Sequence, residues 1–493
     1  MRNHIAIIIA AILLICCSAF GQSFVNWESP HVNPIDITPD GDRLLVVNTA
    51  DNRLEVFTIT GDTIAAVGSI SVGLDPVSVR ARTNDEAWVV NHISDSVSIV
   101  DLGAMSVIAT ITTGDEPTDV VFAGRPQRAF VSLSQLNQVS VYDPADLSTP
   151  PIVLDIEGED PRALATDGEN VYVAIFESGN SSTALNEEFF VSNPNFNPYP
   201  GDPNPPPNDG NQFSPPINPE LPEPPPVSII VKKSADGSWF DDNNGDWSSS
   251  VFWDLHDHDV AVINVQSLAV SYITSAMNLN MHLDVSPNGL VTVVGTDAIN
   301  HVRFEPNVNG IFVRVMLATM TAGSTQADVV LDLNPHLSYE TPTVPQDTRD
   351  LSIGDPRAVK FNDAGDRLYV VGMGSNNVVA LTPDGTRIGL AEVGQGPTGI
   401  AVDDRRNRLY VVNKFDASIS IVDTDKLSEI DRVPFYDPTP QVIRDGRPLL
   451  YSTHATSGLG QASCASCHID GRMDQLAWDL GDPSGDMKSF NQT

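Results

Sequence analysis

Five consecutive residues near the end of the chain, Cys464-Ala465-Ser466-Cys467-His468, have the types and the spacing to hold a haem covalently. Two thiols three positions apart can each add to one vinyl group of the same porphyrin, and the histidine that follows directly can ligate the iron. The sequence therefore predicts one covalent haem c, attached through Cys464 and Cys467, with His468 as the proximal iron ligand.

The number of cysteines favours this interpretation. The chain has four, and Cys16 and Cys17 lie in an N-terminal segment that we expect to be removed, so both remaining thiols belong to the motif. The alternative is a disulfide or a thioredoxin-like redox pair. Such a pair sits at the strand-to-helix turn of a βαβ unit; no such unit surrounds the motif, and the adjacent histidine would have no role.

The ligand on the far side of the iron is open. Met487 is the first candidate, because a thioether ligand raises the haem potential; Met473 and His454 are two others. Only 25 residues follow His468, whereas a cytochrome c domain normally needs several more tens of residues to wrap its haem. We expect a chain cut within its haem domain, so that the far ligand lies in sequence that is absent; a vestigial domain is the alternative.

Two other clusters have the types of metal ligands. The run from Asp241 to Asp246 is rich in carboxylate and amide oxygens and could hold a calcium ion, although its glycine does not fit the EF-hand spacing. In an extended strand His256 and His258 would point to the same side, which suits a metal. A solvated acidic turn and an ordinary polar turn are the alternatives.

The elements that position these residues repeat about every 42 positions. Short apolar strands rich in β-branched residues alternate with Gly, Asp and Asn turns, as in Gly41–Asn48, Gly365–Gly372 and Arg406–Asn413. A period of 40 to 45 residues predicts the blades of a β-propeller. We expect an all-β, seven-bladed propeller whose blades open near Pro34, Pro76, Pro117, Pro161, His282, Pro356 and Pro397.

The expected organisation has three parts: a signal peptide over 1–21, a propeller over 22–445 and a short α-helical, cytochrome c-like haem-binding segment over 446–493, which is incomplete. A Pro/Asn-rich insertion over 181–256 splits the fourth blade, and its proline-rich part should form an extended loop. The strands on its two sides are expected at Val171–Phe176 and Asp259–Asn264, and the fifth blade at Leu290–Val294 and Asn300–Phe304. A strand after Pro438 could close the ring.

The N-terminus predicts export. Arg2 precedes the apolar run Ile5–Ile15, which is too short to span a bilayer. The small residues Ala19 and Gly21 occupy the −3 and −1 positions of a signal-peptidase cleavage site before Gln22. Acylation of Cys16 or Cys17 is the alternative. No later segment is apolar enough to span a membrane, so we expect no transmembrane anchor after cleavage and a periplasmic, extracellular or cell-surface location.

The formal net charge of −37 limits the partners. It would repel phosphate backbones, which argues against nucleic-acid binding, and it favours a redox partner protein with a basic or neutral surface. A solvated acidic surface with no role in binding is the alternative. The sequence contains no nucleophile elbow, Walker loop, dinucleotide fingerprint or H-E-x-x-H motif, so a hydrolase, kinase or NAD enzyme has no support.

Two family resemblances follow from these motifs. The repeats, with Leu409-Tyr410-Val411-Val412-Asn413 as an example, resemble YVTN-type propellers over most of 33–445. Cys464–Asp474, followed by Leu476–Pro483, resembles the haem segment of the di-haem cytochrome c peroxidase and MauG-like family. That resemblance implies electron transfer or peroxide chemistry, although the chain has one C-x-x-C-H where the peroxidases have two.

Three hypotheses remain from the sequence, and whether the protein is an enzyme stays open. The first is an exported haem protein for electron transfer, with the propeller as a docking platform. The second is a haem enzyme of the peroxidase or oxidase type. The third is a non-enzymatic surface or periplasmic binding module, because propellers host many unrelated functions.

Overall fold

The computed structural model describes residues 28–185, 198, 229–242, 244–253, 257–301, 312–479 and 489–490. The expected signal peptide, most of the proline-rich insertion, His256 and Met487 lie outside these ranges. Among the described residues, no helix has the length and apolar character needed to cross a bilayer.

Most of the chain forms antiparallel sheets of four strands that follow one another in sequence. Their strand orders are β1(Ile35–Ile37)-β2(Arg43–Asn48)-β3(Arg53–Thr60)-β4(Thr63–Ser71), β5(Pro76–Ala81)-β6(Glu86–Asn91)-β7(Ser96–Asp101)-β8(Ser106–Thr112), β9(Pro117–Ala123)-β10(Arg128–Leu133)-β11(Gln138–Tyr142)-β12(Ile152–Asp155), β24(Pro356–Phe361)-β25(Leu368–Gly372)-β26(Asn377–Leu381)-β27(Arg387–Glu392) and β28(Pro397–Asp403)-β29(Arg408–Asn413)-β30(Ser418–Asp423)-β31(Ser428–Pro434).

A larger sheet lies between the third and the fourth of these. Its order is β19(Val270–Ile273)-β18(Val260–Asn264)-β14(Asn170–Glu177)-β20(Leu279–Val285)-β21(Val291–Ala298)-β22(Val313–Met320)-β23(Val329–Asp332), with β13(Glu159–Thr166) paired to β14. The two halves of this sheet meet through the pair Glu177↔Leu279.

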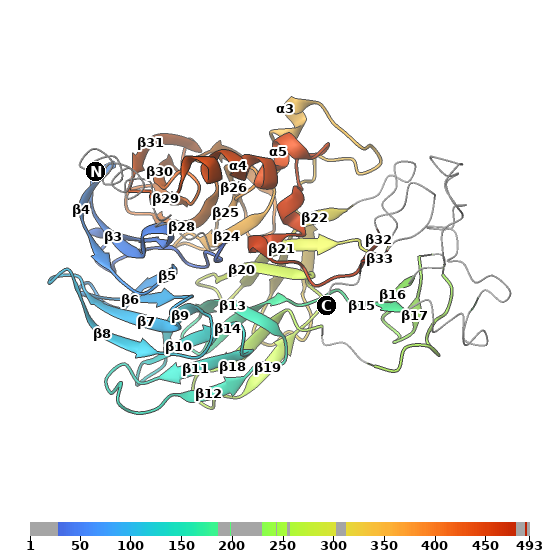
Figure 1. The fold of residues 1–493 in the computed structure, drawn as a ribbon, viewed down its shortest axis with the longest axis horizontal. Helices are drawn as coiled ribbons and strands as arrows, with labels where there is room; N and C mark the ends of the chain where they lie inside the picture. Colours follow the sequence, from blue (N-terminus) through green and yellow to red (C-terminus); the bar gives the residue numbers. More distant parts are fainter. Residues whose placement is uncertain are drawn as a thin grey trace, which may run out of the picture.

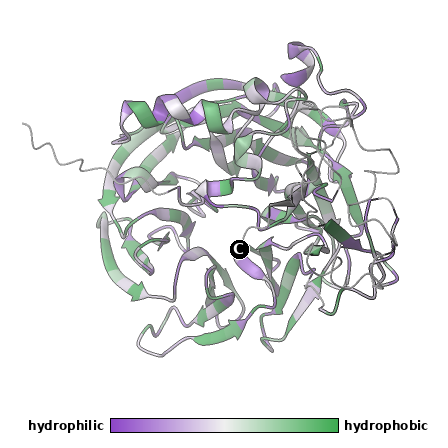
Figure 2. Cartoon of the chain, turned by 45° about the vertical axis from the view of Figure 1, so that its right-hand side comes forward, coloured by the Kyte–Doolittle hydropathy of each residue, from purple (hydrophilic) through white to green (hydrophobic). Residues whose placement is uncertain are grey.

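The innermost strands contact one another in a closed circuit, from β1 through β5, β9, β13, β20, β24 and β28 back to β1. Figure 1 shows the sheets arranged around this common centre. The expected all-β propeller architecture is therefore supported. Inner strands such as β2 are buried on both faces, whereas outer strands such as β8 alternate between exposed and partly buried residues. In Figure 2 the hydrophobic colour lies along the strands.

The residue before the proline of several innermost strands has a left-handed backbone. Asp75, Glu116, Asp160 and Asp355 have φ of 52°, 49°, 59° and 52°, and Gly396 has 66°. Proline lacks an N–H, so it tolerates the start of a strand where no ladder partner is available. The glycine of the Gly-x-x-Pro pattern has a separate reason, because a Cβ on Gly73, Gly114, Gly158 or Gly394 would lie within 2.4–2.8 Å of a neighbouring side chain.

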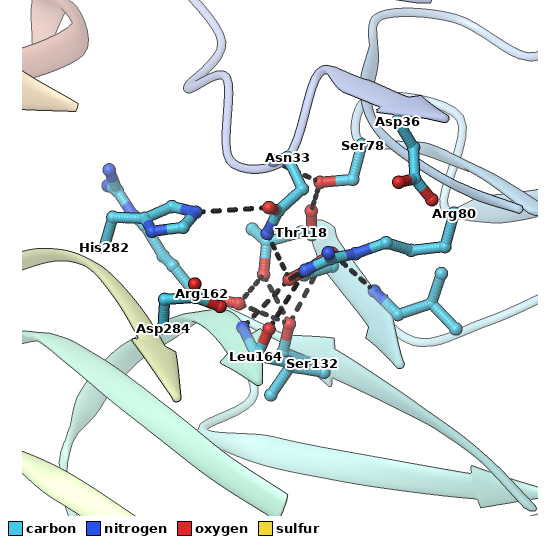
Figure 3. Close-up of polar contacts among 12 residues, drawn as sticks. Asn33, Asp36, Ser78, Arg80, Thr118, Ser132, Arg162, Leu164, His282 and Asp284 are labelled. Atoms are coloured by element: carbon cyan, nitrogen blue, oxygen red, sulfur yellow. Dashed lines mark hydrogen bonds and ion pairs between the residues drawn. The ribbon is translucent and has the colours of Figure 1, made fainter. Parts of the chain in front are cut away.

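Side chains near the centre join neighbouring blades (Figure 3). The carboxylate of Asp36 on β1 accepts from the Ala81 N–H at 2.8 Å, and that of Asp284 on β20 accepts from the Phe361 N–H at 2.8 Å. Ser78 on β5 likewise donates to the Thr118 carbonyl at 2.6 Å. Buried backbone groups at the blade junctions thus have partners, which fixes each blade against the next.

Two strand expectations were wrong. Asn300 lies in a turn rather than a strand, and the strand that follows β21 is β22; residues 302–304 lie outside the described residues. The residues after Pro438 form α4(Gln441–Tyr451), not a closing strand. The expected strands Val171–Phe176 and Asp259–Asn264 do correspond to β14 and β18, which pair with each other.

The two ends of the insertion form a unit that the sequence did not reveal. Strands β15(Ser182–Leu185), β16(Ile229–Lys233) and β17(Trp239–Phe240) make a small antiparallel sheet, seen at the right of Figure 1. Its own apolar cluster includes Leu185, Ile229, Val231, Trp239 and Trp247.

The last part of the chain is largely irregular. After α4 come α5(Thr453–Thr456), the 3₁₀ turns η4(Cys464–Ser466) and η5(Ile469–Gly471), and the short pair β32(Trp478–Asp479)–β33(Ser489–Phe490). A short helix, α3(Gln346–Arg349), lies in the loop before β24. We call residues 452–479 the haem loop, after the motif that it contains.

Candidate haem-attachment site

The Cys-x-x-Cys-His motif forms one tight turn. Ser463 caps η4, its N–H accepted by the Ser466 hydroxyl at 3.0 Å, and the His468 N–H donates to the Cys464 carbonyl at 3.1 Å. The turn brings Cys464, Cys467 and His468 close together within about one turn of chain, as covalent attachment of one porphyrin requires.

The three side chains differ in exposure. Cys464 and His468 are exposed, Cys467 is half-buried, and both cysteines are free thiols. Burial, together with the neighbouring Asp474 carboxylate, raises the pKa of the Cys467 thiol. The donor set therefore fits a covalently bound haem: two unpaired thiols and an imidazole stand on one turn, with the histidine open to a large ligand.

The haem loop has no apolar core of its own. Cys467, Leu476 and Trp478 pack with Ala298, Phe312 and Val313 of the propeller, and the Phe312 and Trp478 rings lie 4.7 Å apart. Ile469 packs with Phe176, Leu279 and Met281, while Ala465 packs with Met373, Phe415 and Tyr451. The propeller supplies the apolar surface that the loop needs.

A buried ionic cluster fixes the loop to the propeller. The Asp470 carboxylate accepts from Arg162 Nη1 at 2.9 Å and from Arg357 Nη1 at 2.9 Å, and the three side chains are 4–6% exposed. Although burial alone would raise it, the two guanidinium groups hold the pKa of Asp470 well below its usual range. We call these three residues the Asp470 clamp.

The two arginines of the clamp are themselves held in the same way. Arg162 donates to both carboxylate oxygens of Asp160, at 3.0 and 2.6 Å, and Arg357 donates to both of Asp355, at 2.7 and 3.2 Å. Each acid stands two residues before its arginine, in the left-handed turn that opens the strand. The two arginines therefore belong to two copies of an Asp-Pro-Arg sequence, one on each of two blades.

Close backbone approach adds to this attachment. The Thr453 N–H donates to the Gly374 carbonyl at 2.9 Å, and a Cβ on Gly354 or Gly374 would lie 2.5 or 2.6 Å from the Thr453 side chain. At the other end of the loop, Arg472 forms an ion pair with Glu116. The start, middle and end of the loop are thus all attached to the propeller.

A polar pocket of about 700 Å³ lies between the haem loop and blade residues. Its lining comprises Ser134, Gln135, Glu159, Asp160, Glu177, Ser178, Gly179, Asn180, Ser181, Ser182, Arg472, Asp474, Gln475 and Leu476. Burial, with Asp160 and Glu159 nearby, raises the pKa of Glu177 to about 7. Asp474 links this pocket to the motif, because it accepts from Trp478 Nε1 at 2.8 Å and contacts Cys467.

The remaining candidates lie elsewhere. Asp241 accepts from Gly245 N and Trp247 Nε1, at 2.8 and 2.7 Å, so its carboxylate closes its own turn. His258 stacks on Tyr272 and contacts the Glu157 carbonyl. Within the described ranges no three His, Cys, Asp or Glu side chains gather in a group that could hold a metal. The calcium site, which includes an undescribed Asn243, stays a prediction.

The three candidates for the second iron ligand differ in what the structure says of them. Met487 lies outside the described residues, so its role stays a prediction. Met473 is half-buried. His454 contacts the Ser352 carbonyl through Nε2 at 2.9 Å and lies 3.8 Å from Asp350 through Nδ1, so both ring nitrogens face the propeller. This geometry does not favour His454 as an iron ligand.

Sequence reasoning missed the Asp470 clamp. Its signal was present: two of the repeats open with Asp-Pro-Arg, at Asp160-Pro161-Arg162 and Asp355-Pro356-Arg357, where the others lack the arginine. An arginine at a strand position that faces the propeller centre needs a carboxylate partner, and Asp470 is an acidic residue directly beside the motif.

Comparison with known proteins supports the fold and no more. No protein-family model and no curated protein matches the chain. The solved structure of Kuenenia stuttgartiensis hydrazine synthase is similar over 82% of this chain and 98% of that chain, at 14% identity and a TM-score of 0.55. The structures of U3-55K and of a streptogramin B lyase cover 80% and 79% of this chain at 9% and 8% identity, with TM-scores of 0.47 and 0.43.

Proposed function

We propose that the chain is an exported c-type haem protein that transfers electrons, with its propeller as the rigid platform for the haem loop. The observation that carries this proposal is the Cys464–His468 turn itself. Two free thiols and an exposed histidine lie within one turn of a loop that the propeller holds in place. When bound, the haem would supply an iron that accepts and releases one electron.

The chain's own residues have separate roles in this proposal. Cys464 and Cys467 would hold the porphyrin through thioether bonds, and His468 would ligate the iron, with Met487 as the proposed second ligand. Phe312 and Trp478 pack beside Cys467 and would exclude water from that side of the porphyrin. Low water access stabilises the less charged state of a redox centre, so these aromatics would influence its potential.

Other parts of the proposal follow from the sequence. We infer seven blades, with the larger sheet counted as two, and the resemblances to YVTN-type propellers and to the haem segment of the di-haem peroxidase family support the assignment. The net charge of −37 favours a redox partner with a basic or neutral surface. The N-terminal segment favours a periplasmic or extracellular location.

The test is a visible spectrum of the full chain, exported in a host with c-type haem maturation. Haem that stays with the denatured polypeptide, and that is lost in Cys464→Ala/Cys467→Ala, is the expected result. A six-coordinate, low-spin spectrum in both oxidation states would support electron transfer. A wild-type chain that carries no covalent haem would overturn the proposal and leave the propeller as a binding module.

A second candidate function is a haem enzyme of the peroxidase or oxidase type, and the polar pocket favours it. The pocket adjoins the haem loop and contains Glu177, whose carboxyl can gain or lose a proton near neutral pH, as a general acid–base group must. A five-coordinate spectrum, with a peroxide reaction that Glu177→Gln slows, would favour this candidate. A six-coordinate haem inert to peroxide would exclude it.

A further inference from the structure

We propose that Asp470 is a positioning residue for the Cys464–His468 turn, and that the propeller holds this turn in shape before any haem is bound. The purpose of such positioning rests on the proposed haem function, and the experiment below separates the two. The effect is exerted through the backbone, because Asp470 stands two residues beyond the proposed iron ligand and its carboxylate points away toward the propeller.

The backbone at Asp470 is bent sharply. Its φ and ψ are 52° and 34°, in the left-handed region, and the Arg472 N–H closes the turn by donating to the Ile469 carbonyl at 2.8 Å. Aspartate is among the non-glycine residues that adopt this conformation most readily, as at Asp75 and Asp95. What distinguishes Asp470 is that the two guanidinium groups of the clamp hold its carboxylate at this bend.

The clamp is set by the propeller rather than by the loop. Arg162 lies on β13 and Arg357 lies on β24, and each guanidinium is held on its other edge by the acid two residues before it, Asp160 or Asp355. Neither arginine is free to swing toward a moving loop. Two fixed cations, on different blades, therefore define one location for the carboxylate between them.

Residues before and after His468 are buried while its own side chain stays exposed. Ile469, the next residue, is 1% exposed, and Ala465, three positions earlier, is fully buried, with the half-buried Cys467 between Ala465 and the exposed His468. Burial on both sides with exposure at the ligand is the arrangement expected of a preorganised site. The contacts that bury these residues join the loop to the propeller and to α4.

The experiment measures how fast each thiol reacts with a maleimide in the full chain without haem, by mass spectrometry. Asp470→Asn and Asp470→Gly both suit a left-handed backbone and remove the negative charge. Glu116→Gln is the matched control, because it removes the ion pair between Glu116 and Arg472. Arg472 lies on the same loop as Asp470, but its side chain is 39% exposed. Far-UV circular dichroism checks that the propeller stays folded.

In the wild-type chain we expect Cys464 to react quickly and Cys467 slowly, since Cys464 is exposed and Cys467 is half-buried. In both Asp470 variants the Cys467 rate should rise by about tenfold or more, through local opening of the loop. In Glu116→Gln it should stay within about twofold. Wild-type Cys467 rates in the folded Asp470 variants would overturn the proposal.

The same variants, exported with haem maturation, separate this inference from the proposed function. With covalent haem, Asp470→Asn should shift the reduction potential and the haem spectrum, and Glu116→Gln should not. Faster Cys467 labelling in the variants combined with no haem on the wild-type chain supports the positioning role and overturns the haem function. Covalent haem with unchanged labelling and an unchanged potential overturns the positioning role alone.

Discussion

Replacing Arg357 by methionine should destabilise the protein by about 3–5 kcal/mol at neutral pH, the usual cost of breaking a buried ion pair from one side. The guanidinium donates to both oxygens of Asp355 and both of Asp470, and the side chains are 5%, 1% and 6% exposed. Methionine fills much of the volume and leaves two buried carboxylates, with Arg162 as the remaining clamp cation.

A surface arginine with the same number of partners serves as the control. Arg432 donates to both oxygens of Glu429, at 2.9 and 2.9 Å, and lies 3.4 Å from Asp416, but its side chain is 40% exposed. Because water screens that pair, Arg432→Met should cost about 1 kcal/mol or less. Burial is the main difference between the two sites, so the comparison isolates desolvation.

The assay is urea unfolding of the full chain, followed by tryptophan fluorescence and checked for reversibility. The pH dependence has a defined sign. In the wild type, Arg357 and Arg162 hold the pKa of Asp470 below its unfolded value of about 4, so this stabilisation is present at pH 5 to 7 and lost in stronger acid. In the variant the orphaned carboxylates protonate more readily, so the difference between variant and wild type should shrink as the pH falls. Equal losses for both arginine variants at pH 7 would refute the reasoning.

Three further changes have expected outcomes. Glu177→Gln should stabilise the protein at pH 8 by on the order of 2 kcal/mol and have little effect near pH 4, because the folded carboxyl has its pKa raised to about 7 and loses stability as it ionises; urea midpoints at both pH values, with Glu159→Gln as a control, check this. Asp259→Asn should cost about 2–3 kcal/mol in urea unfolding, because the new amide N–H₂ would face the backbone N–H groups that the buried carboxylate now accepts. Replacing 186–228 by a short turn should change the melting temperature by less than about 3 °C, because β15 and β16 already pair directly at that point; a larger fall, measured by calorimetry, would show that the segment contributes to the fold.

The sequence predicted the propeller well because its repeats combine two independent signals. The apolar strands alternate with turn residues, and a proline marks the start of most inner strands, so period and local chemistry agree. The fifth blade was the weak point. Its proline is absent, and the third strand was placed before the turn signal Pro306-Asn307-Val308-Asn309-Gly310 rather than after it, about a dozen residues too early relative to β22.

The sequence predicted an α-helical segment from residue 446 and a strand after Pro438, so only the first part of helix α4 was not predicted. Its sequence carries Gly446 and Pro448, which are unfavourable inside a helix, and Val442 and Leu449 are exposed on it. Arg447 and Tyr451 instead face inward, Arg447 lying 5.0 Å over the Phe415 ring. The helix is held by tertiary contacts with the propeller, and local propensity does not report such contacts.

The haem motif could be predicted because its five residues are adjacent in the sequence. The arginines that hold the loop, Arg357 and Arg162, lie about 110 and 300 positions before Asp470. The haem loop is too short to build a cytochrome core, and the structure shows the consequence: Ile469 and Ala465 are buried by propeller side chains, and Asp470 is held by two blades. An acid two residues after His468 has no evident role until the two Asp-Pro-Arg turns, on strands separated in the ring by β20, are seen to pair with it. The ring arrangement of the propeller brings those turns together at one end of its centre, so a pattern repeated for folding also supplies the cations that fix the loop.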